Sequence, residues 1–295
     1  MKIRNVLLPV DFSPRTEPEL TLGVEISRAF GARLSLLNNQ DAAPLGLSRG
    51  WDWQAEHREA SGRSTAVETE LRRLLASLPP DLAADATVSR GLIVPAILQL
   101  ARQLPADLIV VTSHGEGTED HTSVAERLIA EAPCPVLTVQ EGLAADPTLK
   151  LREEGCEVLA PTDFSPSSLR AVEYALELAR TWPIRLRLLH VLPMPEPPIA
   201  SREGITVTSP AGPAVAAARR RLEELVPADL RDRVTCVVEC GEPSARIAAA
   251  CAAPRVDFVV MGEHAPGLRG LLTHDTARDL LRQAPCPVWF VPAQA

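Results

Sequence analysis

The chain contains one unit twice. The sequence PVDFSP at residues 9–14 returns as PTDFSP at 161–166, and APCPV at 132–136 returns unchanged at 284–288. Both pairs are separated by 152 positions (163 minus 11 and 284 minus 132). Because a fixed internal period defines the repeated structural unit, we expect two tandem domains, 1–140 and 156–295. Residues 141–155 lack apolar periodicity and are expected to form the linker.

Composition excludes several classes of protein. The net charge of −8 argues against general nucleic-acid binding, which needs a cationic surface to displace counterions from phosphates. The longest apolar runs have the length of strands, so no segment is expected to span or bind a membrane. The chain begins with an apparent strand rather than a signal peptide. We therefore expect a cytoplasmic protein.

Each copy alternates short apolar, β-branched runs with longer segments of helical period, a pattern typical of a parallel sheet covered by helices. The expected strands are 3–10, 33–38, 83–89, 107–112 and 135–139, then 156–161, 185–191, 233–239, 256–261 and 287–291. The expected helices are 15–30, 57–77, 93–103 and 122–131, then 166–181, 212–225, 243–253 and 275–283. The sequence thus predicts an α/β fold in both halves.

Three patterns recur in register: a first strand ending in Pro-[Val/Thr]-Asp-Phe-Ser, a fourth reading Asp-[Leu/Phe]-[Ile/Val]-Val, and a last helix running into Ala-Pro-Cys-Pro-Val. Together they resemble the universal stress protein family over nearly the whole chain. The resemblance implies two Rossmann-like domains, each a five-stranded parallel sheet of order 3-2-1-4-5 with helices on both faces. It also implies intramolecular pairing of the two domains through their last strands, 135–139 and 287–291, and allows a homodimer.

In the ATP-binding branch of that family, the nucleotide lies where the strand order reverses, between the first and fourth strands. The resemblance implies that Asp11 and Asp163 are the aspartates on the ribose side. It also implies that the backbone of Val191, in His190-Val191, lies near adenine. The first copy departs from this pattern, because it has Asn38-Asn39 at the end of the second strand.

The phosphate loop of the family has the form Gly-x2-Gly-x9-Gly-[Ser/Thr], in which glycines let backbone N–H groups approach the anion. The first copy has Thr112 for the first glycine, keeps Gly115, and reaches Thr122-Ser123 after only six residues. Three missing residues remove up to roughly 10 Å of reach. Acidic residues also follow Gly115, and a carboxylate repels phosphate by about 1 kcal/mol per close pair even in water.

The second copy keeps Gly262 but has Ala265 at the second glycine, with Gly267 at a different spacing. Its helix start carries His274-Asp275, and an aspartate there takes the position of a phosphate. We therefore predict a non-enzymatic regulatory or interaction module with degenerate nucleotide clefts and no bound cofactor. The alternative is a sensor of ATP or AMP with Mg²⁺, more readily in the second domain.

Three simpler or competing interpretations stay open. Asp11 and Asp163 can organise the turn into the first helix without any ligand. The histidines of the two fourth-strand loops (His114, His121, His264 and His274) could bind a divalent metal, although no known ligand spacing is present. The six cysteines are too sparse for a disulfide framework and are interpreted as structural.

Overall fold

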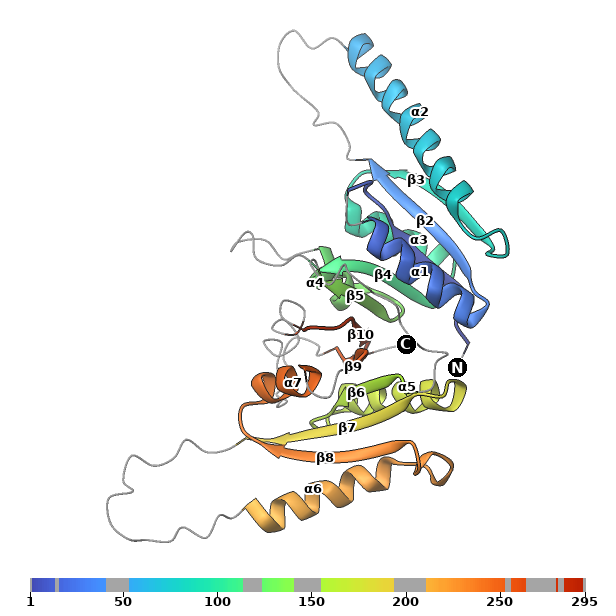
Figure 1. Cartoon of the computed structure of the whole chain (residues 1–295). Coiled ribbons are helices and arrows are strands. Elements are labelled where there is room, and N and C mark those ends of the chain that lie inside the picture. The colour runs from blue at the N-terminus through green and yellow to red at the C-terminus, as the bar shows by residue number, and fades with distance from the viewer. Residues whose placement is uncertain are drawn as a thin grey trace. The chain divides into compact units, whose positions relative to one another are not determined.

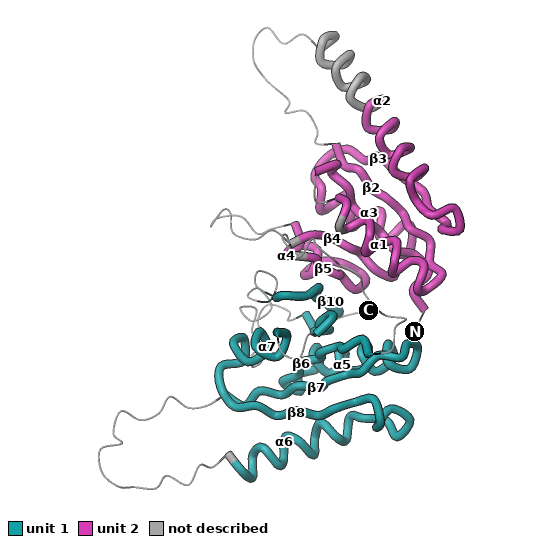
Figure 2. Tube along the Cα trace, viewed as in Figure 1, with its two compact units in different colours: residues 1, 113–117, 149–295 teal, residues 2–112, 118–148 magenta. Residues whose placement is uncertain are grey.

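The structure is a computed structural model of the whole chain. It describes residues 2–13, 16–40, 53–113, 124–140, 155–193, 211–252, 256–263, 280 and 284–293. The chain divides into two compact units, an N-terminal one of residues 2–112 and 118–148, and a C-terminal one built mainly of residues 149–295 (Figure 2). Each unit is described by itself.

The N-terminal unit alternates strands and helices in chain order (Figure 1). Its elements are β1 (Asn5–Pro9), α1 (Thr16–Phe30), β2 (Arg33–Gln40), α2 (Trp53–Ser77), β3 (Ala84–Arg90), α3 (Ile93–Gln103), β4 (Leu108–Ser113), α4 (Val124–Glu131) and β5 (Val136–Gln140). The strand order is β3-β2-β1-β4-β5, and β1 pairs in parallel with both β2 and β4.

The C-terminal unit repeats this plan (Figure 1). Its elements are β6 (Glu157–Pro161), α5 (Pro166–Thr181), β7 (Arg185–Leu192), α6 (Ala211–Leu225), the 3₁₀ turn η1 (Ala228–Leu230), β8 (Val234–Cys240), α7 (Pro243–Ala252), β9 (Phe258–Gly262) and β10 (Val288–Val291). The order β8-β7-β6-β9-β10 is again 3-2-1-4-5. The predicted fold class is confirmed in both copies. The predicted helix 275–283 lies, apart from residue 280, outside the described residues.

The central strands are apolar on both faces because helices cover both faces of a parallel sheet. Val6, Leu7 and Leu8 of β1 are fully buried, as are Val158 and Leu159 of β6. Because parallel crossovers are right-handed, the reversal of strand order after the third strand places α1 and α2 opposite α3 and α4 in the N-terminal unit, and α5 and α6 opposite α7 in the C-terminal unit. The same reversal separates the connections after β1 and β4, and those after β6 and β9, at the carboxyl ends of these strands.

One residue of the family-like pattern before the fourth strand has a structural task. The carboxylate of Asp107 accepts hydrogen bonds from the backbone N–H groups of Arg4 (2.7 Å) and Asn5 (3.0 Å) at the start of β1. In the second copy Asp257 accepts from the N–H of Glu157 (2.8 Å) at the start of β6. Both aspartates thus satisfy backbone donors that the sheet itself leaves open.

Candidate functional site: two crevices at the carboxyl ends of the strands

The turn that follows the first strand is the same in both units. The backbone N–H of Ser13 donates to Asp11 Oδ1 (2.9 Å), and that of Ser165 donates to Asp163 Oδ1 (3.0 Å). The first helix is tied to the same oxygens, because the hydroxyls of Thr16 (3.2 Å) and Ser168 (2.7 Å) also donate to them. Both predicted ribose-side aspartates therefore organise the turn, as the simpler interpretation expects.

The residue after each aspartate has an uncommon backbone conformation. Phe12 has φ of 60° and Phe164 has φ of 62°, in the left-handed region that bulky side chains rarely occupy. Such a conformation costs of order 1–3 kcal/mol and persists only where its surroundings determine it. Its recurrence in both copies indicates that the hydrogen bonds around Asp11 and Asp163 impose one fixed turn.

A buried side chain of the second strand is hydrogen-bonded to the backbone of this turn in both units. In the C-terminal unit, Nδ1 of His190 lies 2.8 Å from the carbonyl oxygen of Thr162, directly before Asp163. A carbonyl can only accept, so Nδ1 carries the proton. In the N-terminal unit, Nδ2 of Asn38 donates to the carbonyl of Val10 over the same 2.8 Å. The exchange of histidine for asparagine, which departs from the family pattern in sequence, preserves the hydrogen bond.

The next position of the second strand differs between the copies. Val191 is a buried apolar residue of β7, paired with Glu239 of β8. Its counterpart Asn39 joins a polar network, donating to the carbonyl of Gly91 (2.8 Å) and accepting from the hydroxyl of Ser89 (2.7 Å). The site predicted on the adenine side is thus apolar in the C-terminal unit and occupied by internal hydrogen bonds in the N-terminal unit.

The two units differ most clearly at the carboxyl end of the fourth strand, where an open α/β sheet is expected to form its crevice. In the N-terminal unit, the backbone N–H and the hydroxyl of Thr112 both lie 2.6 Å from Oε1 of Glu19, a helix α1 residue only 6% exposed. Thr112 lies near the carboxyl end of β4, the strand that pairs with β1 where the strand order reverses. A carboxylate therefore stands where the first glycine of a phosphate loop would offer its N–H.

In the C-terminal unit, Gly262 occupies this position and Ala171 stands at the position of Glu19. A Cβ on Gly262 would lie 2.3 Å from the carbonyl oxygen of Ser167 in the first turn of α5. The glycine is thus required by close packing between β9 and α5, whether or not a ligand binds. Among the described residues of this unit, no carboxylate stands at the position of Glu19, which is Ala171.

Several predicted site residues are not among those that the structure describes. Gly115, Thr122, Ser123 and Gly267 lie outside the described residues, as do the four loop histidines proposed as metal ligands. Within the described ranges, no group of three or more His, Cys, Asp or Glu side chains is arranged to hold a metal ion. Sequence reasoning missed Glu19. Comparison of the copies provides the signal, because Glu19 in the first copy corresponds to the fully buried Ala171 in the second.

The helix that follows the third strand also begins differently in the two copies. The carboxylate of Glu242 accepts from the N–H groups of Ser244 (3.0 Å) and Ala245 (2.7 Å), which caps the start of α7. Burial opposes its ionisation, but the hydrogen bonds from Ala245 and Ser244 outweigh burial and lower the pKa of Glu242. Its counterpart Leu92 provides no side-chain cap for α3.

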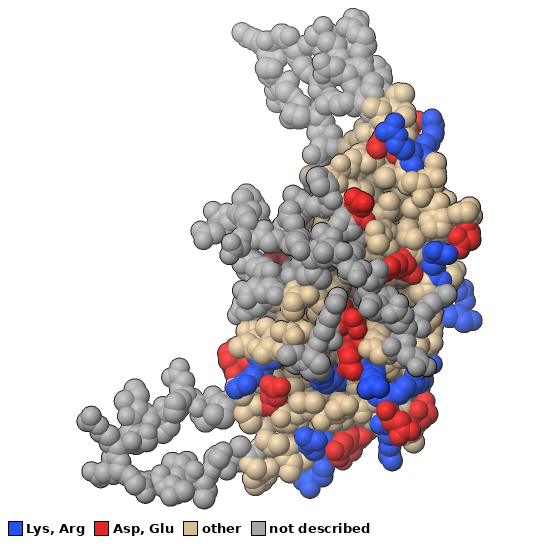
Figure 3. All heavy atoms as spheres, in the orientation of Figure 1, with Lys and Arg blue, Asp and Glu red and all other residues tan. Residues whose placement is uncertain are grey.

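Two general properties of the described residues bear on partners. On the face drawn in Figure 3, basic and acidic side chains are interspersed rather than gathered into one basic surface. None of the described helices is both long enough and apolar enough to cross a lipid bilayer.

Comparisons with known proteins agree with this description. Residues 2–140 and 157–292 match the model of the universal stress protein family. A curated relative from Thermus aquaticus, named universal stress protein in QAH/OAS sulfhydrylase 3′ region, is 31% identical over 140 residues, which cover 46% of this chain and 98% of the relative.

Two solved structures resemble the chain along nearly its whole length. A universal stress protein from Archaeoglobus fulgidus has a TM-score of 0.70 at 20% identity, covering 99% of this chain and 97% of that one. A putative universal stress protein from Pseudomonas aeruginosa has a TM-score of 0.58 at 18% identity, covering 98% of this chain and 93% of that one. At these identities the likeness is one of fold.

Proposed function

Since this chain belongs to the universal stress protein family, with two tandem domains, we propose that it is a non-enzymatic regulatory or interaction module whose N-terminal crevice excludes polyphosphate. One observation carries the proposal: the buried carboxylate of Glu19 takes the backbone N–H of Thr112 at the switch point. A phosphate placed there would find this N–H already bonded to Glu19. It would also be repelled by the carboxylate, and in a setting less polar than water this repulsion exceeds the roughly 1 kcal/mol expected in bulk water.

A second candidate function concerns the C-terminal crevice alone. Gly262 is retained there, the counterpart of Glu19 is the uncharged Ala171, and Val191 is a buried apolar residue. These features favour a nucleoside or nucleotide, ATP or AMP with Mg²⁺, bound beside Asp163. In that case the protein is a sensor in which the C-terminal unit binds and the N-terminal unit does not.

Nucleotide titration of the full chain tests both functions. Calorimetry with ATP·Mg²⁺, AMP and adenosine, together with thermal unfolding, is expected to give no binding at the N-terminal crevice. Ligand bound to the native state raises the unfolding temperature by mass action, so a shift of several degrees in excess ATP·Mg²⁺ reports an occupied crevice.

A matched pair of substitutions assigns any signal. Asp163→Asn removes binding if the C-terminal crevice is used, whereas Asp11→Asn leaves that binding intact. Loss of ATP binding in Asp11→Asn alone would contradict the proposed exclusion at the N-terminal crevice. Turnover of ATP to ADP by either variant or by the parent protein would contradict a non-enzymatic role.

We further propose that the two domains pair within one chain through their last strands, as the family resemblance implies, and that the protein acts in the cytoplasm without nucleic acid. A chain paired internally has no need of a second copy at these strands. Light scattering separates a single chain of 31.8 kDa from a homodimer of twice that mass.

A further inference from the structure

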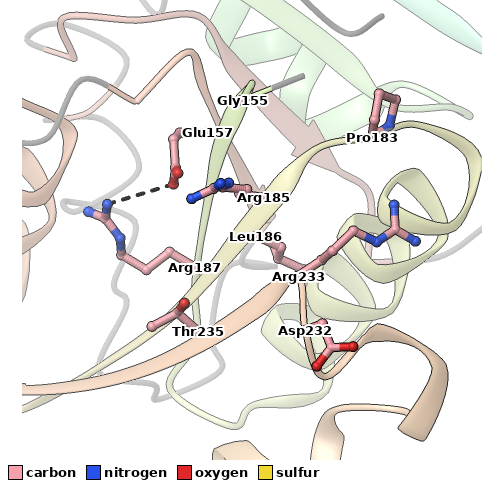
Figure 4. Close-up of a pocket in the computed structure, with 9 residues that line it drawn as sticks. All are labelled: Gly155, Glu157, Pro183, Arg185, Leu186, Arg187, Asp232, Arg233 and Thr235. Carbon is pink, nitrogen blue, oxygen red and sulfur yellow. Dashed lines mark ion pairs between the residues drawn. The ribbon is translucent and has the colours of Figure 1, made fainter. Parts of the chain in front are cut away.

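A hollow of about 520 Å³ opens in the C-terminal unit at the amino ends of β6, β7 and β8 (Figure 4). This is the end of the sheet opposite the crevice formed by Asp163 and Gly262. The hollow is lined by charged and polar side chains from the three strands and the segment before β8: Glu157, Arg185, Arg187, Asp232, Arg233 and Thr235. Its volume falls within the range of small-molecule sites.

Strand register explains why these side chains meet. Glu157 of β6 is paired with Arg185 of β7, and Arg187 is paired with Thr235 of β8. Side chains two positions apart on a strand share one face, so Arg185 and Arg187 project together while Leu186 between them is buried. Figure 4 shows both guanidinium groups on the side of Glu157, and Arg233 extending toward Pro183.

The arginines differ in how far they are neutralised. Arg187 is held in place by a long ion pair with Glu157 (3.8 Å) and by a hydrogen bond to the carbonyl of Ala250 (3.5 Å), and its side chain is 16% exposed. Arg233 donates to the carbonyl of Trp182 (2.9 Å). Because a carbonyl carries no formal charge, this contact does not neutralise the guanidinium. Arg185 is exposed and makes no ion pair or side-chain hydrogen bond within the described residues.

The N-terminal unit shows the same location in a neutral form. There Arg33, at the position of Arg185, forms an ion pair with Asp85 of the neighbouring strand over 2.9 Å. By register, Asp85 corresponds to Thr235 and Ser35 to Arg187. The second copy therefore has a hydroxyl donor in place of the carboxylate beside Arg185, and it has gained the Arg187 guanidinium together with its partner Glu157, which stands at the position of Asn5.

We propose that this hollow is a binding site for a small phosphate-type oxyanion, held between Arg185 and Arg187 with the hydroxyl of Thr235 as a further donor. Guanidinium groups match phosphate oxygens with paired, charge-assisted N–H···O bonds. Arg187 is already positioned by Ala250 and Glu157, so less ordering is needed on binding. Across the lining, three guanidinium groups oppose two carboxylates, which leaves a net positive charge for the anion.

Calorimetry of the full chain with inorganic pyrophosphate at low ionic strength tests the site, with inorganic phosphate and citrate as separate arms. Pyrophosphate is expected to bind, and more weakly as salt is raised. Binding of citrate in preference to pyrophosphate would overturn the phosphate assignment. Absence of a binding heat, together with unchanged NMR chemical shifts of the protein at millimolar pyrophosphate, would overturn the site itself.

Two substitutions and one control locate the binding. Arg185→Gln removes an exposed cation, and Thr235→Asp restores the carboxylate that Asp85 provides in the other unit; each is expected to weaken binding about tenfold or more, since a charge-assisted contact is lost or opposed. Arg33→Gln in the N-terminal unit is the matched control and leaves the affinity unchanged. Equal affinity in all three variants, with folding verified by circular dichroism, would refute the assignment.

This inference is independent of the proposed function. The hollow shares no residue with the crevice of Asp163, Val191 and Gly262. Pyrophosphate affinity that is unchanged by Arg185→Gln would therefore contradict binding in the hollow without bearing on the crevice. Nucleotide binding lost in Asp163→Asn but retained in Arg185→Gln would concern the crevice alone. Failure of one proposal therefore leaves the other standing.

Discussion

Glu19 accepts both the backbone N–H and the hydroxyl of Thr112 with a single carboxylate oxygen, at 2.6 Å each. A buried carboxylate is tolerated only where donors compensate for its lost hydration. The pair thus ties helix α1 to the end of β4. The same contact supports the proposed exclusion of phosphate from this position.

Substitution of Glu19 tests this contact. Glu19→Ala leaves two part-buried donors of Thr112 without their acceptor and is expected to lower the free energy of unfolding by about 1–2 kcal/mol. Glu17→Ala, at an exposed position of the same helix, is expected to change it by less than about 0.5 kcal/mol. Urea denaturation followed by circular dichroism measures both. Similar values for the two variants would show that Glu19 does not hold the strand end.

Gly262 is predicted to tolerate no side chain. The Cβ of Gly262→Ala would lie 2.3 Å from the carbonyl oxygen of Ser167, so β9 or α5 must move. Such overpacking costs typically 1–3 kcal/mol and occasionally more. Gly212→Ala is the control, because a Cβ there meets nothing within 4 Å and alanine favours a helix. A Gly262→Ala protein as stable as the parent would contradict the packing argument.

The exchange of His190 for Asn38 between copies predicts a rescue. His190→Ala loses the hydrogen bond to Thr162 and the contact with the ring of Phe164, whose centroid lies 4.6 Å away, and is expected to cost about 3 kcal/mol. His190→Asn, which copies the other unit, is expected to recover about 1 kcal/mol of that loss. Thermal unfolding ranks the three proteins. An asparagine variant no more stable than the alanine variant would show that the hydrogen bond is not preserved.

Buried thiols are predicted to be chemically inert in the native protein. Burial, reinforced by the nearby charge of Asp107, raises the pKa of Cys134 to about 12. A hydrogen bond with Cys251, together with burial, raises the pKa of Cys286. Because the thiolate is the reactive form, iodoacetamide at pH 8 is expected to leave Cys134 and Cys286 unmodified until urea unfolds the chain. Peptide mass spectrometry checks this, and rapid native labelling of Cys134 would contradict it.

The order of elements was predictable because two copies repeat the same signals independently. Element ends were less so: helix α2 begins at Trp53 rather than near residue 57, since apolar periodicity is weak in its first turns. Glu19 was missed because an acid in the first turn of a helix is ordinarily explained by the helix dipole. The hollow around Arg185 depends on which residues of three strands stand side by side, and that register is fixed only by the folded sheet.

Acid is predicted to weaken the start of helix α7 through Glu242. Its folded-state pKa lies below the usual 4.5, so its stabilising contribution is present above pH 4.5 and is lost as the pH falls through the lower folded value. At this largely exposed site Glu242→Gln is expected to cost at most about 1 kcal/mol at pH 7, as for a helix cap, and progressively less as the pH falls below 4.5. Urea midpoints measured for both proteins from pH 3 to pH 7 reveal the difference. A stability gap that stays constant across this range would show that the ionised carboxylate does not cap the helix.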